Sequence, residues 1–166
     1  MDLKRYEEAK LSFASDLMKA VLAARQLPVA DTFEYHFAFG NTLGALGDAR
    51  GMEKQLSRAL QIAAIEMGDA EYCRRAWFSL ARLATHLNEW DRLMQITLEM
   101  EAFAQNTQNL TIWHGAMEVR ARAFKEMGDY ENARELGEKL LDFCRTRNLG
   151  EGMETWEKFL ASLPKA

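Results

Sequence analysis

The sequence contains little that breaks a helix and little that binds a metal ion. Of its 166 residues only two are proline, two cysteine and three histidine. Pro28 and Pro164 lie near the ends, so the long region between them lacks the residue that most strongly interrupts an α-helix. Residues that favour helices, such as Ala, Leu, Met, Glu and Arg, are plentiful, and sheet-forming residues are scarce. The composition therefore predicts an all-α protein.

The residues that usually carry enzyme chemistry occur without the spacing that such chemistry needs. Cys73 and Cys144 are 71 positions apart, which is no metal-ligand pairing and predicts buried, reduced thiols. His36, His86 and His114 match neither a metal-binding spacing nor a catalytic motif. We therefore predict no catalytic residue, no metal site, no cofactor and no enzymatic activity.

Charge and hydropathy exclude several kinds of partner. No uninterrupted apolar run approaches the ~20 residues that a membrane-spanning helix needs. Residues 1–8 carry charges where a secretory signal would be apolar, so we expect a cytoplasmic chain. The net charge of −4 argues against a nucleic-acid binder, which normally has a basic excess. The sequence predicts neither a membrane nor a nucleic-acid partner.

Three consecutive segments of the sequence, residues 30–69, 70–109 and 110–149, are similar to one another. A shift of 40 residues places Trp90 on Tyr130 and Asn88-Glu89 on Gly128-Asp129, and a shift of about 41 places Gly47-Asp48 on Asn88-Glu89. Matches in a constant order at a nearly constant spacing are typical of a repeat protein.

Each copy predicts two helices, because apolar residues recur at intervals of three and four on both sides of a turn. Gly-Asp suits that turn, since Gly favours a helix end and Asp caps the next helix. The predicted stripes are Phe33, Phe37, Gly40, Leu43 and Met52, Leu56, Leu60, Ala63 in the first copy; Trp77, Leu80, Ala81, Ala84 and Trp90, Leu93, Ile96, Met100, Phe103 in the second; and Trp113, Met117, Ala121, Phe124 and Tyr130, Ala133, Leu140, Phe143 in the third.

Both ends of the chain extend this pattern. Residues 2–26 predict one amphipathic helix, and residues 150–163 predict a last helix with Trp156 and Phe159 on one face. The last helix would cover the exposed apolar edge of the third copy, as the terminal helix of a solenoid does. We therefore expect about eight helices in a single domain, residues 1–166.

The residues around the turns resemble the tetratricopeptide signature. They are Phe39-Gly40-Asn41-Thr42-Leu43 followed by Gly47-Asp48, and Phe124 followed by Gly128-Asp129-Tyr130-Glu131-Asn132-Ala133. The period near 40 resembles the longer-helix variety of bacterial regulators and of Pins/LGN-type scaffolds. This resemblance implies a right-handed α-solenoid of antiparallel helix pairs, in which the first helix of each pair lines a concave groove that binds protein segments.

The residues expected to face this groove flank the packing stripe of each first helix. They are Glu34, Phe37, Asn41, Gly44, Arg75, Phe78, Arg82, Thr85, Gly115, Glu118, Arg122 and Lys125. Four are basic and two acidic, so we predict a groove for an acidic peptide or protein segment, with Phe37 and Phe78 as apolar anchors. Charge reversal of Arg82 and Arg122 together should then abolish binding.

Other interpretations of the same residues remain open. The charges on the first helices can equally be solvated surface charges beside partly buried phenylalanines. In place of an adaptor, the chain can be a peptide-sensing regulatory domain that controls an effector, or a structural scaffold that assembles with copies of itself.

Overall fold

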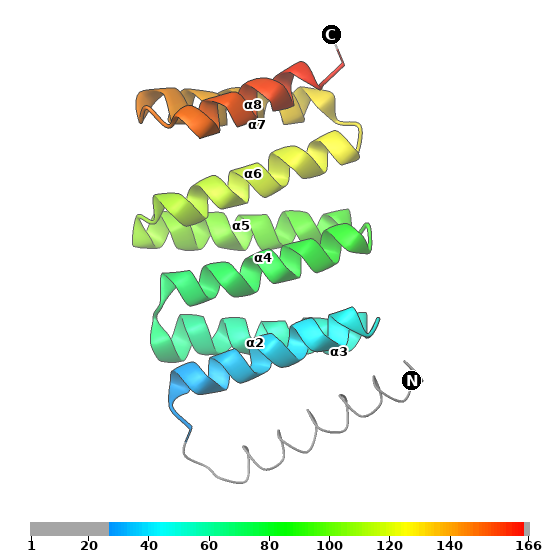
Figure 1. The fold of residues 1–166 in the computed structure, drawn as a ribbon, viewed down its shortest axis with the longest axis vertical. Coiled ribbons are helices and arrows are strands. Elements are labelled where there is room, and N and C mark those ends of the chain that lie inside the picture. Colours follow the sequence, from blue (N-terminus) through cyan, green and yellow to red (C-terminus); the bar gives the residue numbers. More distant parts are fainter. Residues whose placement is uncertain (1–26, 165–166) are drawn as a thin grey trace. The chain divides into compact units, whose positions relative to one another are not determined.

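The computed structural model describes residues 27–164, and this region consists of helices joined by short turns, without a strand. The described elements are α2 (Val29–Ala45), α3 (Ala49–Gln61) with its π-helical continuation η1 (Ile62–Met67), α4 (Ala70–His86), α5 (Trp90–Thr107), α6 (Leu110–Glu126), α7 (Tyr130–Thr146) and α8 (Gly150–Ala161) (Figure 1). The all-α prediction is confirmed for these residues. The helix predicted over 2–26 lies outside them, and the last helix ends at Ala161 rather than at residue 163.

The predicted turns are confirmed, and their side chains explain where the helices begin. Asp48 caps α3 by accepting a hydrogen bond of 2.8 Å from the backbone N–H of Gly51, and Asp129 accepts one of 3.2 Å from that of Asn132. Each bond satisfies one of the N–H groups that a helix start leaves without a partner. Local sequence thus determines these boundaries.

Residues with left-handed backbone end the helices at a regular interval. They are Gly47, Gly68, Asn88, Gln108, Gly128 and Asn148. The separation between successive members is constant, except that the first, from Gly47 to Gly68, is longer by a single residue. Because a left-handed residue after the last helical turn is a common way to end a helix, the interval marks a repeated structural unit. Two such intervals make up one period of the repeat read from the sequence.

The first copy of the repeat is one residue longer than the later copies, and the extra residue lies in the π-helix η1. The second helices, α3 with its continuation η1, α5 and α7, each bury the residues 4, 8, 11 and 15 positions after the N-cap. These are Met52, Leu56, Ala59, Ala63; Leu93, Thr97, Met100, Ala104; and Ala133, Gly137, Leu140, Cys144. The register is therefore shared as far as Ala63, and the extra residue lies between Ala63 and Gly68. A π-helix is the usual way for a helix to accommodate one inserted residue.

The helices divide into two compact units, of which one ends at Leu83 and the other begins at Ala84, within α4. In the first unit α2 packs against α3, and Phe33, Leu56 and Ile62 are fully buried. In the second unit α5, α6, α7 and α8 pack in chain order, around a core that includes Leu140 and Trp156. The prediction of a single domain over 1–166 stays a prediction.

Most residues of the predicted stripes are buried or half-buried, but Tyr130 is not. It begins α7 with 41% of its surface exposed, so its inclusion in the stripe was wrong. Tyr130 lies in the first turn of the helix, at the edge of the packed face, where apolar spacing alone overstates burial.

The two thiols are free and buried, as the sequence predicted. Burial, reinforced by the nearby Asp69 carboxylate, raises the pKa of the Cys73 thiol to about 11. Burial also raises the pKa of Cys144. Among residues 27–164, no helix combines the length and the hydropathy needed to cross a membrane.

Candidate binding site

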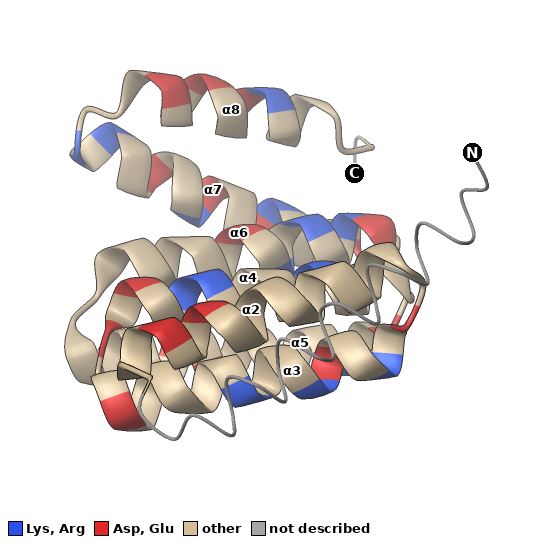
Figure 2. Ribbon diagram, turned by 60° about the horizontal axis from the view of Figure 1, so that its bottom comes forward, with Lys and Arg blue, Asp and Glu red and all other residues tan. Residues whose placement is uncertain are grey.

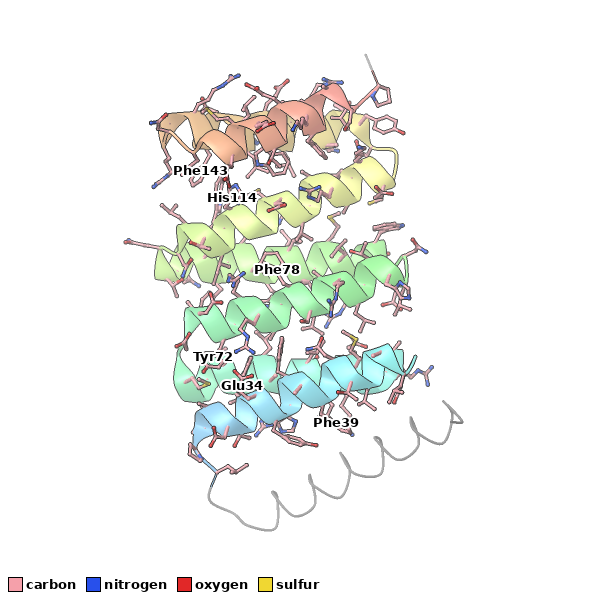
Figure 3. All side chains as sticks on the ribbon, in the orientation of Figure 1. Glu34, Phe39, Tyr72, Phe78, His114 and Phe143 are labelled. Carbon is pink, nitrogen blue, oxygen red and sulfur yellow. The ribbon has the colours of Figure 1, made fainter. Side chains whose placement is uncertain are left out.

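Two of the predicted groove residues of the first unit, Glu34 on α2 and Arg75 on α4, form a two-pronged ion pair. The guanidinium nitrogens of Arg75 donate to the two carboxylate oxygens of Glu34 at 2.5 and 2.9 Å. This pairing lowers the pKa of Glu34, because its hydrogen bonds outweigh the opposing effect of burial. Arg75 also lies 4.6 Å from the ring centre of Phe37 and 5.3 Å from those of Phe33 and Tyr72. Arg75 thus joins α2 to α4, and two of the residues that it contacts, Glu34 and Tyr72, are labelled in Figure 3.

A second contact between α2 and α4 involves Arg82, whose partner is neutral. Its guanidinium donates to the side-chain oxygen of Asn41 at 3.0 Å, and the Asn41 amide donates to the Phe37 carbonyl at 2.9 Å. Arg82 is 41 residues after Asn41, just as Arg75 is 41 residues after Glu34, so both contacts join equivalent positions of two copies. The Arg82 side chain is exposed, and no carboxylate of the described residues neutralises it.

The two predicted apolar anchors are half-buried, and each is covered by an arginine. Arg75 lies over the ring of Phe37, and the guanidinium carbon of Arg74 lies 5.7 Å from the ring centre of Phe78. Arg74 in turn pairs with Glu71 on the same helix. These rings support arginines within the chain, which leaves less of their surface for a partner.

In the second unit the predicted residues Glu118, Arg122 and Lys125 lie on α6. Arg122 donates to Glu118 at 3.0 Å, one turn away on the same helix. Lys125 donates to the hydroxyl of Ser162 at 2.8 Å, which joins α6 to the end of α8. Of the two other predicted residues of this unit, Thr85 is exposed near the end of α4, whereas Gly115 is buried in α6.

The four predicted cations therefore differ in whether a neighbouring carboxylate compensates their positive charge. Arg75 and Arg122 each have a carboxylate partner, whereas the partners of Arg82 and Lys125 are an amide and a hydroxyl. Since only a carboxylate cancels the charge, the positive potential is concentrated at Arg82 and Lys125. Seven predicted groove residues lie in the first unit and five in the second, so the single continuous groove stays a prediction.

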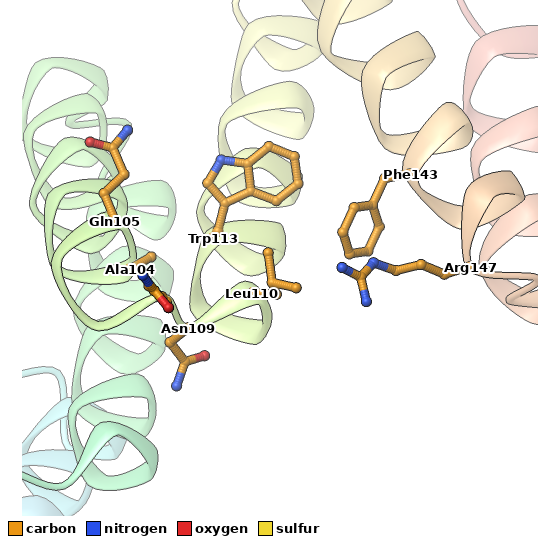
Figure 4. A pocket seen from close by; sticks show the side chains of 8 residues that line it. Ala104, Gln105, Asn109, Leu110, Trp113, Phe143 and Arg147 are labelled. Carbon is orange, nitrogen blue, oxygen red and sulfur yellow. The ribbon is translucent and has the colours of Figure 1, made fainter.

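A hollow that the sequence did not predict lies in the second unit, between the end of α5, the start of α6 and the end of α7. Its volume is about 560 Å³. It is lined by the rings of Trp113 and Phe143, whose centres are 5.4 Å apart, and by the amide side chains of Gln105 and Asn109 (Figure 4). Arg147 lies over the ring of Phe143, with its guanidinium carbon 4.8 Å from the ring centre.

A smaller hollow of about 430 Å³ adjoins the first. It shares Leu110, Phe143 and Arg147 with it and adds Leu149 and His114, whose ring centre is 5.4 Å from that of Phe143 (Figure 3). We call the two together the corner pocket. Its lining is mainly aromatic and aliphatic, with uncharged polar groups such as the amides of Gln105 and Asn109 and with Arg147 as its arginine.

The corner pocket was missed because helical periodicity assigned Trp113 and Phe143 to the packed face. Both are only half-buried, and both line the larger hollow. One sequence signal could have indicated it. Leu149 stands one repeat period after Asn109 and two periods after Asp69, at a position where those two residues cap helices.

Charges elsewhere in the second unit form local pairs. Lys139 pairs with Glu135 and Lys158 with Glu154, each one turn away on the same helix. In Figure 2 acidic and basic residues are mixed along α7, whereas α8 carries acidic residues followed by a basic one near its end. Pairs this exposed are screened by water and hold little net potential.

Within residues 27–164, no group of three or more histidine, cysteine or acidic side chains is placed to hold a metal ion. No protein-family model matches the sequence, and no curated protein matches the chain.

Proposed function

We propose that the chain is a tetratricopeptide-type repeat module, forms a right-handed solenoid and binds an acidic protein segment along its first helices, without catalysis. The observation that carries this proposal is the pair of exposed or half-exposed cations on those helices, Arg82 and Lys125, whose partners in the chain are neutral.

The regular repetition supports the repeat assignment. Helix ends recur at one interval, with a single residue added in the first copy, and three second helices bury the same four positions. A helix pair of this size cannot bury its apolar face alone, so repeats are stable only when neighbours stack.

The hydrogen bonds of Arg82 leave capacity for a ligand. A guanidinium has five N–H donors, and one contact with the Asn41 oxygen accounts for few of them. A carboxylate from a partner would form charge-assisted hydrogen bonds, which are stronger than the bond to a neutral amide. Lys125 has a comparable advantage, because a carboxylate would be a stronger partner than the Ser162 hydroxyl.

The structure also changes which cations the proposal depends on. Arg122 already contacts Glu118, so a ligand would have to compete with an internal carboxylate. We therefore assign ligand contact to Arg82 and Lys125, and we assign Arg75 to joining α2 and α4.

The test reverses both cations, in the variant Arg82→Glu/Lys125→Glu, and compares it with Arg58→Glu/Lys139→Glu. The control changes the net charge equally but alters second helices, α3 and α7, where both residues are exposed and have surface partners. Peptides selected on the full chain from a random twelve-residue display library should contain acidic residues. Fluorescence anisotropy should show that the first variant binds these peptides with an affinity lowered about tenfold or more. The control should bind them with the affinity of the wild type. Equal weakening by both pairs would refute the proposal, because it would indicate a general effect of net charge.

A further inference from the structure

The corner pocket contains an arginine without an acidic partner among the described residues. Arg147 lies over the ring of Phe143 at 4.8 Å, whereas Arg75, Arg120 and Arg122 each contact a glutamate. An arginine held on an aromatic face keeps the N–H edge of its guanidinium free for an anion. The ring contact therefore positions Arg147 at the pocket without neutralising it.

Leu149 next to it occupies a position where the fold would favour a polar residue. At the equivalent positions, Asp69 accepts a backbone hydrogen bond of 2.8 Å and Asn109 accepts one of 3.0 Å, and each caps the following helix. Leu149 gives α8 no side-chain cap, and leucine is among the weakest N-cap residues. Its side chain is 46% exposed and lines the smaller hollow. Side-chain capping therefore does not account for a leucine here, although its backbone N–H helps to close the end of α7 by donating to the Cys144 carbonyl at 2.9 Å.

The apolar lining of the pocket is also unusually accessible. Leu110 is 46% exposed like Leu149, and the half-buried rings of Trp113 and Phe143 form the wall beside it. Concave apolar surface of this volume with one fixed charged group is typical of binding sites. Arg147 and Phe143 line both hollows, so the charge stands between two apolar recesses.

We propose that the corner pocket binds an acidic-apolar segment of another protein, which places a carboxylate on Arg147 and one apolar side chain in each recess. The forked guanidinium can hold a carboxylate by two parallel hydrogen bonds, which orients the segment across the pocket. Trp113 and Leu110 contact the side chain on one side, and Leu149 contacts that on the other. This site is separate from Arg82 and Lys125, so the inference goes beyond the function proposed above.

The test selects a random twelve-residue display library on the full chain and measures the selected peptides by fluorescence anisotropy. Peptides of the corner pocket should carry Asp or Glu between apolar residues, and Arg147→Glu should weaken them about tenfold or more. Arg145→Glu is the matched control. It makes the same charge change two residues away on α7, where Arg145 is 57% exposed and pairs with Glu157 outside the pocket. This control should leave the affinity unchanged.

A second variant separates binding from folding. Leu149→Asn introduces the cap that Asn109 forms, so it should raise the Tm by about 2–4 °C while it weakens the peptides several-fold. A purely structural residue would not move stability and affinity in opposite directions. Absence of any peptide that prefers wild type to Arg147→Glu would overturn the inference. Peptides that are lost only on Arg82→Glu/Lys125→Glu would overturn it too, but would support the function proposed for the first helices.

Discussion

Deletion of Ile65 should be tolerated, because the π-helix η1 already contains one residue more than the equivalent segments of α5 and α7. The shared buried register ends at Ala63, two residues earlier, and Ile65 itself is 73% exposed. Removal of one residue would shorten the interval from Gly47 to Gly68 to the interval that separates all the later helix ends. We expect η1 to become ordinary α-helix.

The expected cost is small. Full burial of an isoleucine is worth about 1.5–3 kcal/mol, so the minor buried part of Ile65 contributes less than about 1 kcal/mol. The exposed pair of Arg58 with Glu66, 3.4 Å apart, would change register, at a cost of about 0.5 kcal/mol. Better α-helical hydrogen bonding offsets part of this, and the free energy of unfolding should stay within about 1 kcal/mol of wild type.

The matched control deletes Asn106, which is exposed and holds the same place in α5, where no extra residue exists. That deletion pulls the Asn109 cap out of position, which costs about 1 kcal/mol, and displaces the fully buried Ile112, which costs a further 1.5–3 kcal/mol. Urea unfolding followed by circular dichroism at 222 nm measures both variants. Equal destabilisation by the two deletions would refute the explanation of η1 as an accommodated insertion.

Two further predictions concern stability. Because the pKa of the Cys73 thiol is raised to about 11, the stability that the buried thiol contributes is complete below the unfolded-state pKa of about 8.5 and is lost as the pH rises through about 11. The urea midpoint of the wild type should therefore fall over this pH range relative to that of Cys73→Ala. Parallel pH profiles of the two proteins would contradict this prediction. The Arg120 side chain, which is little exposed, donates hydrogen bonds to Thr97 at 3.1 Å and to Glu101 at 2.9 Å, both on α5. Arg120→Ala should therefore lower the free energy of unfolding by about 1–3 kcal/mol in the same urea assay. A change below about 0.5 kcal/mol would show that these bonds do not hold α6 to α5.

Much of the fold could be predicted because its signals are local. A turn such as Gly128-Asp129 combines a left-handed residue and a capping carboxylate within two positions, and it specifies a helix boundary without reference to the rest of the chain. The apolar spacing in between identifies the buried face, since residues three and four apart share a side of a helix. These signals predicted the two-helix copies, their turns and most of their buried residues.

The predicted binding residues depended on information that spacing does not contain. The sequence placed Arg75 and Arg82 on one helix face as equivalent cations, yet Arg75 contacts a carboxylate and Arg82 an amide, each 41 residues earlier. Such contacts depend on how two helices pack, and packing also decides that Trp113 and Phe143 border a hollow rather than a core.

The sequence by itself determined the helices, their ends and their repetition, because backbone hydrogen bonding and capping involve residues within about one turn of each other. Only the tertiary structure decided which cations keep their charge, where the inserted residue is accommodated and where a pocket opens. Those outcomes depend on distances between side chains that are remote along the chain, and packing sets these distances.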